Sequence, residues 1–298
     1  MKTMETMDGE STAVTSAPDS QVKPQACSSC AAASGGDGNG GDQPDWVYAI
    51  GKIQVRFPTI SLEKELAQAT ARTDTANLTD RQAMHAVLTK PENRYLVRKL
   101  CWIFSIEGQD TYILKPRDSA DHALLSDSLR AVPSPLDVDV AIGLKGEVAP
   151  FNMCNGLMLP TLYFDQIYSF DRESLISAIP RPPEIPADAF EAASAEVFDT
   201  IMQMADNAGT TDAHRALNYC AVRYPAIYAK AAERFRANSA LTGIEVQPSA
   251  LSGARKIVKV IFAFTDRATD VSERVFLRAD VTEEFPFLVT KLSPYYQR

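Results

Sequence analysis

The periodic apolar pattern of residues 187–235 constrains the fold of this chain more than any other stretch. Its first part places apolar or small residues at spacings of three and four, which is typical of one face of an amphipathic helix. After a short polar break, Thr211 or Asp212 can cap a second helix, which is predicted to end at Pro225. A third helix is expected over residues 226–237, so a group of helices should form the centre of the fold. The face of the first helix consists of Phe190, Ser194, Val197, Phe198, Ile201 and Ala205.

Segments in which apolar and polar residues alternate, as in half-buried strands, lie on both sides of these helices. Residues 46–57 form such a strand, and residues 100–114 favour a hairpin that should pair with it. Residues 256–264 and 272–281 are expected to form a closing antiparallel group. We therefore predict an α+β fold, in which antiparallel sheets from the N- and C-terminal segments pack on the central helices. Further strands are predicted over residues 137–144, 157–164 and 242–246, and further helices over residues 61–72, 79–88, 118–130 and 171–179.

The first 45 residues differ in composition from the rest of the chain. They contain no aromatic residue, no Leu and no Ile, and are dominated by small and polar residues. Such a segment cannot bury enough apolar area to offset its conformational entropy. We therefore expect a disordered tail over residues 1–45, which carries a Cys-x-x-Cys pair, and a single α+β domain over residues 46–298.

Charge and composition exclude several classes of function. The chain has 30 basic and 38 acidic residues and a net charge of −8, which argues against nucleic-acid binding because such proteins carry basic surfaces. No apolar run approaches the roughly 18 residues that a membrane span needs, and the N-terminus lacks the apolar core of a secretory signal. We therefore expect a cytoplasmic protein. In that compartment, five cysteines argue for thiols or metal ligands in preference to a disulfide framework.

Cys27 and Cys30 have the spacing that lets two thiolates bind one zinc ion. One pair supplies half of a tetrahedral site, so the other ligands would come from the same pair of a second copy, giving a homodimer, or from thiols in the folded domain. Cys154 is the preferred candidate there because it lies in a proline-bounded loop, whereas Cys101 and Cys220 lie in apolar periodic segments. The alternatives are that the pair binds nothing under reducing conditions or that it does redox chemistry.

The sequence shows no complete catalytic set. His85, His122 and His214 stand at no ligand or catalytic spacing, and none adjoins a cysteine. The common hydrolase, nucleotide-binding and metalloprotease motifs are absent. Several carboxylates could line a cleft, and the aromatic C-terminus fits either a packed terminal strand or a peptide groove at a sheet edge. The carboxylates are Asp165, Asp171, Glu173, Asp199, Asp206 and Asp212, and the aromatic residues are Phe285, Phe287, Tyr295 and Tyr296.

Two short motifs and the closing strands resemble a known family. The motifs are VYAIGKI over residues 47–53, with Phe57 beyond, and RALNYCA over residues 215–221. Together with the strands after residue 242, they are similar to the domain of unknown function in PatG-type cyanobactin maturation proteases. The resemblance covers roughly residues 46–298. In that family the domain accompanies protease and macrocyclase domains that process ribosomally made peptides. The resemblance also implies cysteine-bound zinc and a dimer, which map here to Cys27 and Cys30.

Cleavage and cyclisation are not expected to carry over, because the chain shows no Ser/His/Asp motif set. We therefore expect a non-catalytic accessory protein that binds a precursor peptide or a maturation enzyme and carries a structural zinc on Cys27, Cys30 and Cys154. The alternative is a peptide-modifying enzyme that uses Cys154, His214 and nearby carboxylates in one cleft. In a third hypothesis, residues 27–33 themselves form a modifiable peptide segment.

Overall fold

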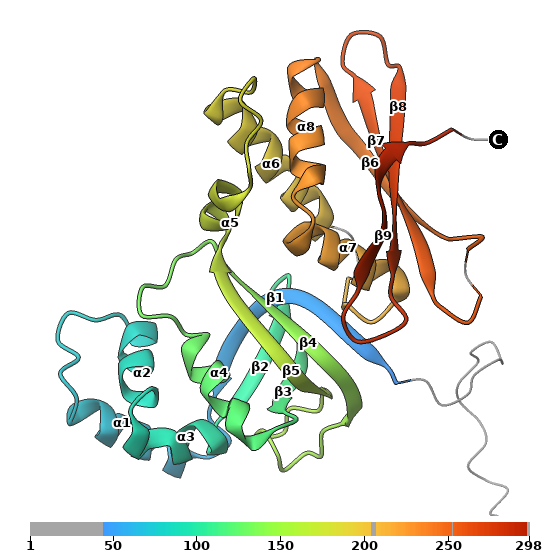
Figure 1. The fold of residues 1–298 in the computed structure, drawn as a ribbon. Coiled ribbons are helices and arrows are strands. Elements are labelled where there is room, and N and C mark those ends of the chain that lie inside the picture. The colour runs from blue at the N-terminus through green and yellow to red at the C-terminus, as the bar shows by residue number, and fades with distance from the viewer. Residues whose placement is uncertain (1–43, 204–206, 252, 297–298) are drawn as a thin grey trace, which may run out of the picture. The chain divides into compact units, whose positions relative to one another are not determined.

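The computed structural model describes residues 44–203, 207–251 and 253–296, which belong to one compact unit (Figure 1). The predicted tail, with Cys27 and Cys30, therefore lies outside the described residues except for its last two positions. Ala205 and Asp206 lie outside them as well. The described elements confirm an α+β fold with largely antiparallel sheets.

The N-terminal strands close into a barrel. In order around the barrel the strands are β1 (Trp46–Arg56), β2 (Cys101–Ile106), β3 (Gln109–Pro116), β5 (Pro160–Asp171) and β4 (Asp137–Val148). All neighbours are antiparallel except β3 and β5, which are parallel. The sequence predicted the β2–β3 hairpin and its pairing with β1, and both are confirmed.

β1 changes its pairing partner along its length, and this change allows the barrel to close. Residues 46–51 of β1 pair with β4, and residues 52–56 pair with β2. The change of partner falls at Gly51, where an added Cβ would lie 2.3 Å from the carbonyl oxygen of Ser105. A glycine at this position therefore lets the strand bend while the backbones stay close.

The barrel core follows the alternation of the strands and is extended by short helices. Between β1 and β2 lie α1 (Ile60–Ala71), α2 (Asp80–Leu88), the 3₁₀ turn η1 (Pro91–Asn93) and α3 (Arg94–Lys99), and the turn η2 (Ser119–Asp121) and α4 (His122–Asp127) lie between β3 and β4. Thr79 starts α2 with a capping box. The single helix predicted over 118–130 is replaced by η2 and α4, and Arg130 has a φ of 57° that ends the helical path. The shared core includes Val47, Ile53, Leu66, Val87, Leu96, Trp102, Phe104, Leu125 and Phe164.

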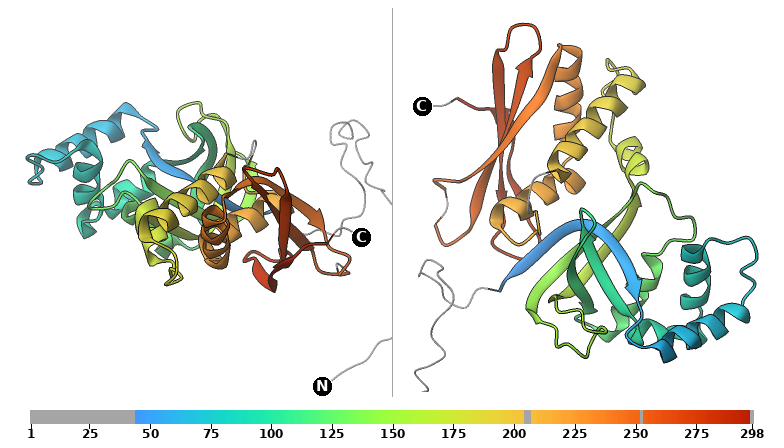
Figure 2. Two further views of the ribbon diagram at one scale, coloured as in Figure 1. Left: turned by 90° about the horizontal axis from the view of Figure 1, so that it is seen from above. Right: turned by 180° about the vertical axis from the view of Figure 1, so that it is seen from behind.

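The C-terminal half forms a layer of helices on an open sheet (Figure 2). After α5 (Arg172–Ala178), the predicted spine appears as α6 (Ala187–Met202), α7 (Asp212–Arg223) and α8 (Ala226–Arg236). The sheet contains β6 (Ser239–Pro248), β7 (Ile257–Asp266), β8 (Ser272–Asp280) and β9 (Phe287–Pro294), in that order and antiparallel. The predicted helix face is buried, since Phe190, Val197 and Ile201 are each at most 3% exposed.

The helices connect the sheet to the barrel. Alternate residues of β7 and β8, such as Val260, Phe262 and Leu277, contact them from one side. Tyr48 and Ile142, which point outward from the barrel, join the same core from the other side. α7 accordingly contacts both β1 and β7. The described part of the chain is therefore held together by one continuous helical layer.

Candidate functional site

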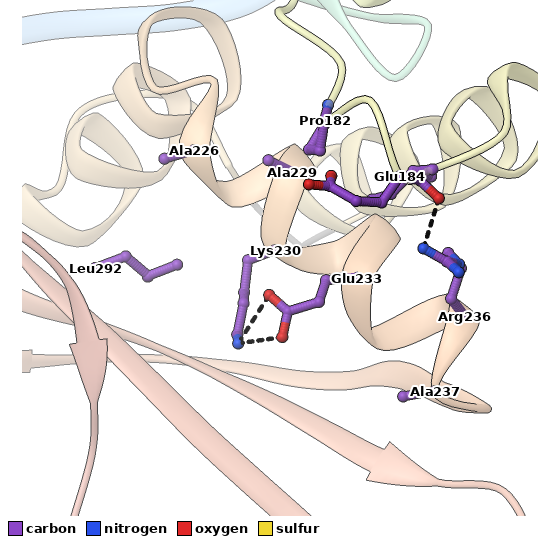
Figure 3. A pocket seen from close by; sticks show the side chains of 10 residues that line it. Pro182, Glu184, Ala226, Ala229, Lys230, Glu233, Arg236, Ala237 and Leu292 are labelled. Carbon is purple, nitrogen blue, oxygen red and sulfur yellow. Dashed lines mark hydrogen bonds and ion pairs between the residues drawn. The ribbon is translucent and has the colours of Figure 1, made fainter.

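A groove with a volume of 660 Å³ lies between α8, the connector after α5, and β9 (Figure 3). One face of α8 lines it, because the groove residues of this helix recur at spacings of three and four. The opposite face of α8, with Ile227, Tyr228 and Ala231, is buried in the core. The helix thus has one face for the fold and one face turned to the groove. The lining residues are Pro182, Glu184, Ile185, Ala226, Ala229, Lys230, Glu233, Arg236, Ala237 and Leu292.

Charged groups of both signs surround the small apolar side chains of the groove. The Lys230 ammonium donates to both carboxylate oxygens of Glu233, at 3.0 and 3.2 Å. The Lys230 side chain is 20% exposed and that of Glu233 is 60% exposed. The guanidinium of Arg236 donates to the carbonyl oxygen of Glu184 at 2.6 Å. Because a pair as exposed as Lys230–Glu233 contributes little to stability, its charges are available to a ligand at small cost.

β9 brings a strand edge to the groove. Within the described sheet β9 pairs only with β8, so its other edge faces no strand. The backbone N–H of Leu292 donates to the hydroxyl of Tyr224 at 2.9 Å, which covers part of that edge. Phe287, at the start of β9, is 48% exposed, whereas Leu288 and Leu292 pack partly against the core. The aromatic C-terminus therefore includes a packed terminal strand whose edge adjoins a groove.

The motifs that carry the family resemblance lie at the contact between the layers, away from the groove. Asn218 donates from Nδ2 to the carbonyl oxygen of Tyr48 at 2.7 Å and accepts at Oδ1 from Asn207 at 2.8 Å. Arg215 donates to the carbonyl oxygens of Val281, at 2.6 Å, and of Glu283. Asn218 is fully buried and Arg215 is 3% exposed. The RALNYCA motif therefore joins α7 to β1, which carries the VYAIGKI motif, and to the segment after β8. Both motifs have a structural role.

The comparisons with known proteins agree with this geometry. Residues 184–295, which include α6 to α8, the open sheet and all groove residues except Pro182, match the family model described as PatG C-terminal. A solved structure titled "PatG Domain of Unknown Function" is similar over 85% of this chain and 99% of its own, with a TM-score of 0.67 and 19% identity. Residues 184–295 therefore match the PatG C-terminal family, and the described fold is that of a PatG-type domain. No curated protein matches the chain.

The PatG-type domain does not bring Cys154 and His214 together. His214 lies in the first turn of α7, where its N–H donates to the Thr211 hydroxyl at 3.1 Å, and α7 reaches β1 near Tyr48. Cys154 lies beside Arg56, at the other end of β1. At about 3.3 Å per residue, Tyr48 and Arg56 are roughly 26 Å apart along the strand. The shared cleft of the enzyme hypothesis is therefore not formed by this pair.

The carboxylates that were candidates for a cleft instead have separate partners. Asp165 pairs with Arg117 at 2.7 Å, and Asp199 pairs with Arg172 at 2.8 Å. Asp171 accepts from the first backbone N–H groups of α5, and hydrogen bonding by Ser134 and these groups lowers its pKa. Glu173 and Asp212 occupy the first turns of α5 and α7. These positions fit helix ends and surface ion pairs.

One carboxylate that the sequence did not single out lies next to Asp165. Glu284, in the loop before β9, is 3.8 Å from the Arg117 guanidinium. Burial, followed by its hydrogen bond with Asp165, raises the pKa of Glu284 to about 7. No spacing in the sequence relates Glu284 to Asp165, because barrel and sheet loops meet there only in the folded chain.

The remaining histidines have local roles. The carbonyl oxygen of His85, in α2, accepts from the Thr89 hydroxyl at 2.7 Å. Nδ1 of His122, at the start of α4, lies 2.9 Å from the carbonyl oxygen of Ser119. Both positions fit the solvated or boundary roles that their helical patterns suggest.

The cysteines require a correction. Cys101 and Cys154 form a disulfide, with Cα atoms 5.8 Å apart. The expectation that the cysteines stay as thiols is therefore wrong for this pair, because the loop after β4 folds back onto the first residue of β2, a contact that a separation of 53 residues does not reveal. While this bond exists, Cys154 has no thiolate to offer to zinc. Cys220 is free and buried, and burial raises its pKa to about 12.

Metal binding stays a prediction. Within the described ranges, no group of three or more His, Cys, Asp or Glu side chains is placed to hold a metal ion. Cys27 and Cys30 lie outside those ranges. The described helices also include none long and apolar enough to cross a membrane.

Proposed function

We propose that this chain is an accessory protein in the maturation of a ribosomally made, post-translationally modified peptide, and that its PatG-type domain binds the precursor peptide or a maturation enzyme. The match to the PatG C-terminal family model supports the pathway. The observation that carries the binding role is the α8 groove beside the edge of β9. Its lining supplies the methyl groups of alanine residues and the Lys230–Glu233 ion pair, which can contact apolar and charged side chains of a peptide.

The size and chemistry of the groove favour an extended peptide. Its volume of 660 Å³ falls within the roughly 300–1,000 Å³ typical of ligand sites. A chain lying along β9 would pair its backbone with the part of the strand edge that Tyr224 leaves uncovered, and would place alternate side chains in the groove. An acidic side chain of the peptide would compete with Glu233 for Lys230, and a basic one would pair with Glu233 or Glu184.

Neighbouring genes test the pathway. We expect a precursor peptide and a maturation enzyme to be encoded beside this gene, because such systems are encoded together. A neighbourhood with neither would contradict the proposed pathway while leaving the groove itself untouched.

Charge reversal tests the groove. If the peptide places an acidic side chain on Lys230, the affinity of Lys230→Glu for a fluorescently labelled copy of the neighbouring precursor peptide should fall at least about tenfold, since a charge-assisted hydrogen bond contributes about 1.5–3 kcal/mol. Fluorescence anisotropy measures this loss. The matched control is Lys64→Glu, an exposed position on α1 that should bind as the wild type does. If both variants bind equally, the peptide does not use this groove. If the wild type binds no precursor but is captured by the neighbouring enzyme, the enzyme arm of the proposal holds.

We also propose that Cys27 and Cys30 bind a structural zinc ion, with the other ligands coming from a second copy of the chain or from reduced Cys154. Elemental analysis of gently purified protein should find zinc, and sedimentation should give the mass of a homodimer. The variant Cys27→Ser/Cys30→Ser should lose the metal and dissociate. Metal-free protein with an unchanged mass in the variant would contradict the proposal.

A further inference from the structure

The loop between β4 and β5 covers an apolar strip on the outside of the barrel. Cys101 and Ile103 of β2 and Ile113 of β3 point outward there, and Ala149 and Cys154 of the loop cover them. Met153, Leu157 and Leu159 add partly buried contacts. Ile103 and Ile113 are at most 2% exposed, so the loop replaces solvent over this strip.

Apart from this apolar packing, the disulfide is the main link between the loop and the barrel strands. Its ends are joined by the N–H of Ala149, which donates to the carbonyl oxygen of Leu159 at 2.8 Å. Turn hydrogen bonds connect residues within the loop, for example from Gly156 to Phe151 at 2.9 Å. Phe151 and Met158 are 70% and 59% exposed, so part of the apolar surface of the loop is already turned outward. The Cys101–Cys154 bond is the covalent link between this loop and β2.

Cys154 lines a pocket beside the bond, although both cysteines are buried, with exposures of 4% for Cys101 and 6% for Cys154. A pocket of 540 Å³ is lined by the end of β1 and by residues 154–157. Cys154 is among its lining residues and Cys101 is not. Cys101 Sγ lies 3.4 Å from the carbonyl oxygen of Met153, so a thiol released at Cys101 has a hydrogen-bond acceptor in place.

The same pocket contains a positive charge. Arg56 is one of its lining residues, with a side chain that is 54% exposed. Asp110 pairs with Arg56 at 2.7 Å, so the charge is partly offset. A cation beside a cysteine favours thiolates, both as attacking groups and as leaving groups. Small thiols that carry carboxylates would be attracted more than neutral ones.

From this geometry we propose that Cys154 is a site of thiol–disulfide exchange with a small acidic thiol, and that exchange releases the loop over residues 149–159. An external thiolate attacks Sγ of Cys154, the Cys101–Cys154 bond breaks, and Cys101 leaves as a thiolate that takes a proton from water. A second external thiolate then attacks the mixed disulfide. The products are the Cys154 thiolate and the oxidised dimer of the external thiol, so two external thiols are oxidised for each protein disulfide reduced. Reduction uncovers Ile103 and Ile113.

Mass spectrometry of the full oxidised chain identifies the sulfur that is attacked. Limiting reduced glutathione is added, the reaction is stopped with N-ethylmaleimide and acid, and the protein is digested with trypsin. Cys101 and Cys154 fall in separate peptides, residues 100–117 and 146–172. The glutathione adduct is expected on residues 146–172 and the maleimide on residues 100–117. The reverse labelling, or no reaction in the folded protein, overturns the proposal.

The role of Arg56 is tested by comparing two thiols at low salt. Arg56→Gln should slow the reaction with glutathione about threefold more than the reaction with neutral 2-mercaptoethanol, because only glutathione carries a net negative charge away from its sulfur. Arg56→Lys should restore the glutathione rate. Equal slowing of both thiols, or of neither, excludes charge attraction at this pocket.

Release of the loop is tested by hydrogen exchange. Amides of residues 149–159 should exchange at least tenfold faster after reduction, since the loop then loses its link to β2. The variant Cys101→Ser/Cys154→Ser should show the same rates without reductant. Unchanged rates in reduced wild type, with the barrel still folded, would show that packing alone holds the loop.

Discussion

The barrel and the C-terminal sheet solve the problem of strand edges in different ways. Each barrel strand pairs with two neighbours, so the barrel has no end strand, although each half of β1 pairs on one side only. The C-terminal sheet is open: β6 and β9 lie at its ends, and helices cover one of its faces. Surface available for adding a partner strand therefore lies in the sheet, beside the α8 groove. The barrel instead offers a loop whose position depends on a covalent bond.

The two regions are also held together by different forces. The barrel combines alternating apolar side chains with the Cys101–Cys154 disulfide. The helical layer is tied to its neighbours by buried polar side chains, Arg215 and Asn218, which satisfy carbonyl oxygens of other elements. Variants that remove one kind of support at a time can separate these contributions.

The largest effect is expected from removing the disulfide. Cys101→Ser/Cys154→Ser should lower the free energy of unfolding by about 3–4 kcal/mol, because the bond constrains a loop of 53 residues in the unfolded chain. Urea unfolding monitored by tryptophan fluorescence measures this loss, since Trp46 and Trp102 both belong to barrel strands. Wild type in reductant should behave in the same way. A loss below about 1 kcal/mol would indicate that the barrel depends on packing alone.

The polar tie between the layers is tested by Asn218→Leu. The variant leaves the Tyr48 carbonyl oxygen and Asn207 without their buried partner, so the free energy of unfolding should fall by about 2–4 kcal/mol. Thr242→Ala, which removes an exposed hydroxyl pair with Thr265, is the control and should cost less than about 0.5 kcal/mol. The tryptophan transition of the barrel should shift with Asn218→Leu. If the tryptophan transition stays in place while the loss of helical circular dichroism shifts to lower urea, the two regions unfold separately.

A pH dependence is expected from Asp139 inside the barrel. This carboxylate is 1% exposed and accepts from the backbone N–H of Ile53 at 2.6 Å and from the Ser169 hydroxyl. Burial raises the pKa of Asp139 to about 6, although both hydrogen bonds lower it.

Since the unfolded pKa is about 3.9, the folded chain binds the proton more tightly, and this contribution to stability is present below about pH 4 and lost as the pH rises through 6. Between pH 4 and 6, wild type should lose about 2 kcal/mol relative to Asp139→Asn. Urea unfolding at several pH values measures the difference, and the exposed control Asp127→Asn should keep the wild-type slope. Parallel curves for wild type and Asp139→Asn would contradict a raised pKa.

The smallest effect is expected in the groove. Lys230→Ala should change the free energy of unfolding by less than about 0.5 kcal/mol, because its partner Glu233 is well exposed. Thermal unfolding compared with the wild type checks this. A loss of about 2 kcal/mol would show that the charges serve the fold, and would weaken the comparison between a self-contained barrel and an open sheet.

The sequence predicted local secondary structure well, but it did not predict the closure of the barrel or other contacts between distant segments. The helix from Thr79, the end of α7 before Pro225 and the buried face of α6 all follow from nearby residues, and the structure confirms them. The first helix begins two residues earlier than predicted, since Thr59 and not Ser61 accepts from its N-terminus.

The parallel pairing of β3 with β5, the closure of the barrel and the Cys101–Cys154 contact join residues that are distant in the chain, and no local pattern specifies them. The α8 groove has the same origin. The helix itself was predicted, whereas the opposing wall, from residues 182–185 and Leu292, comes from segments that are distant from it in the chain or on the other side of a loop.

The outward side chains of β1 and β4 have a practical consequence for anyone who wishes to isolate part of this protein. The segment that matches the family model begins at residue 184, after the barrel is complete. Tyr48, Ile50, Val140 and Ile142 nevertheless belong to the core of that segment. A fragment cut at the family boundary would expose the apolar side of α7 to water. The shortest piece expected to remain monodisperse therefore starts near Trp46.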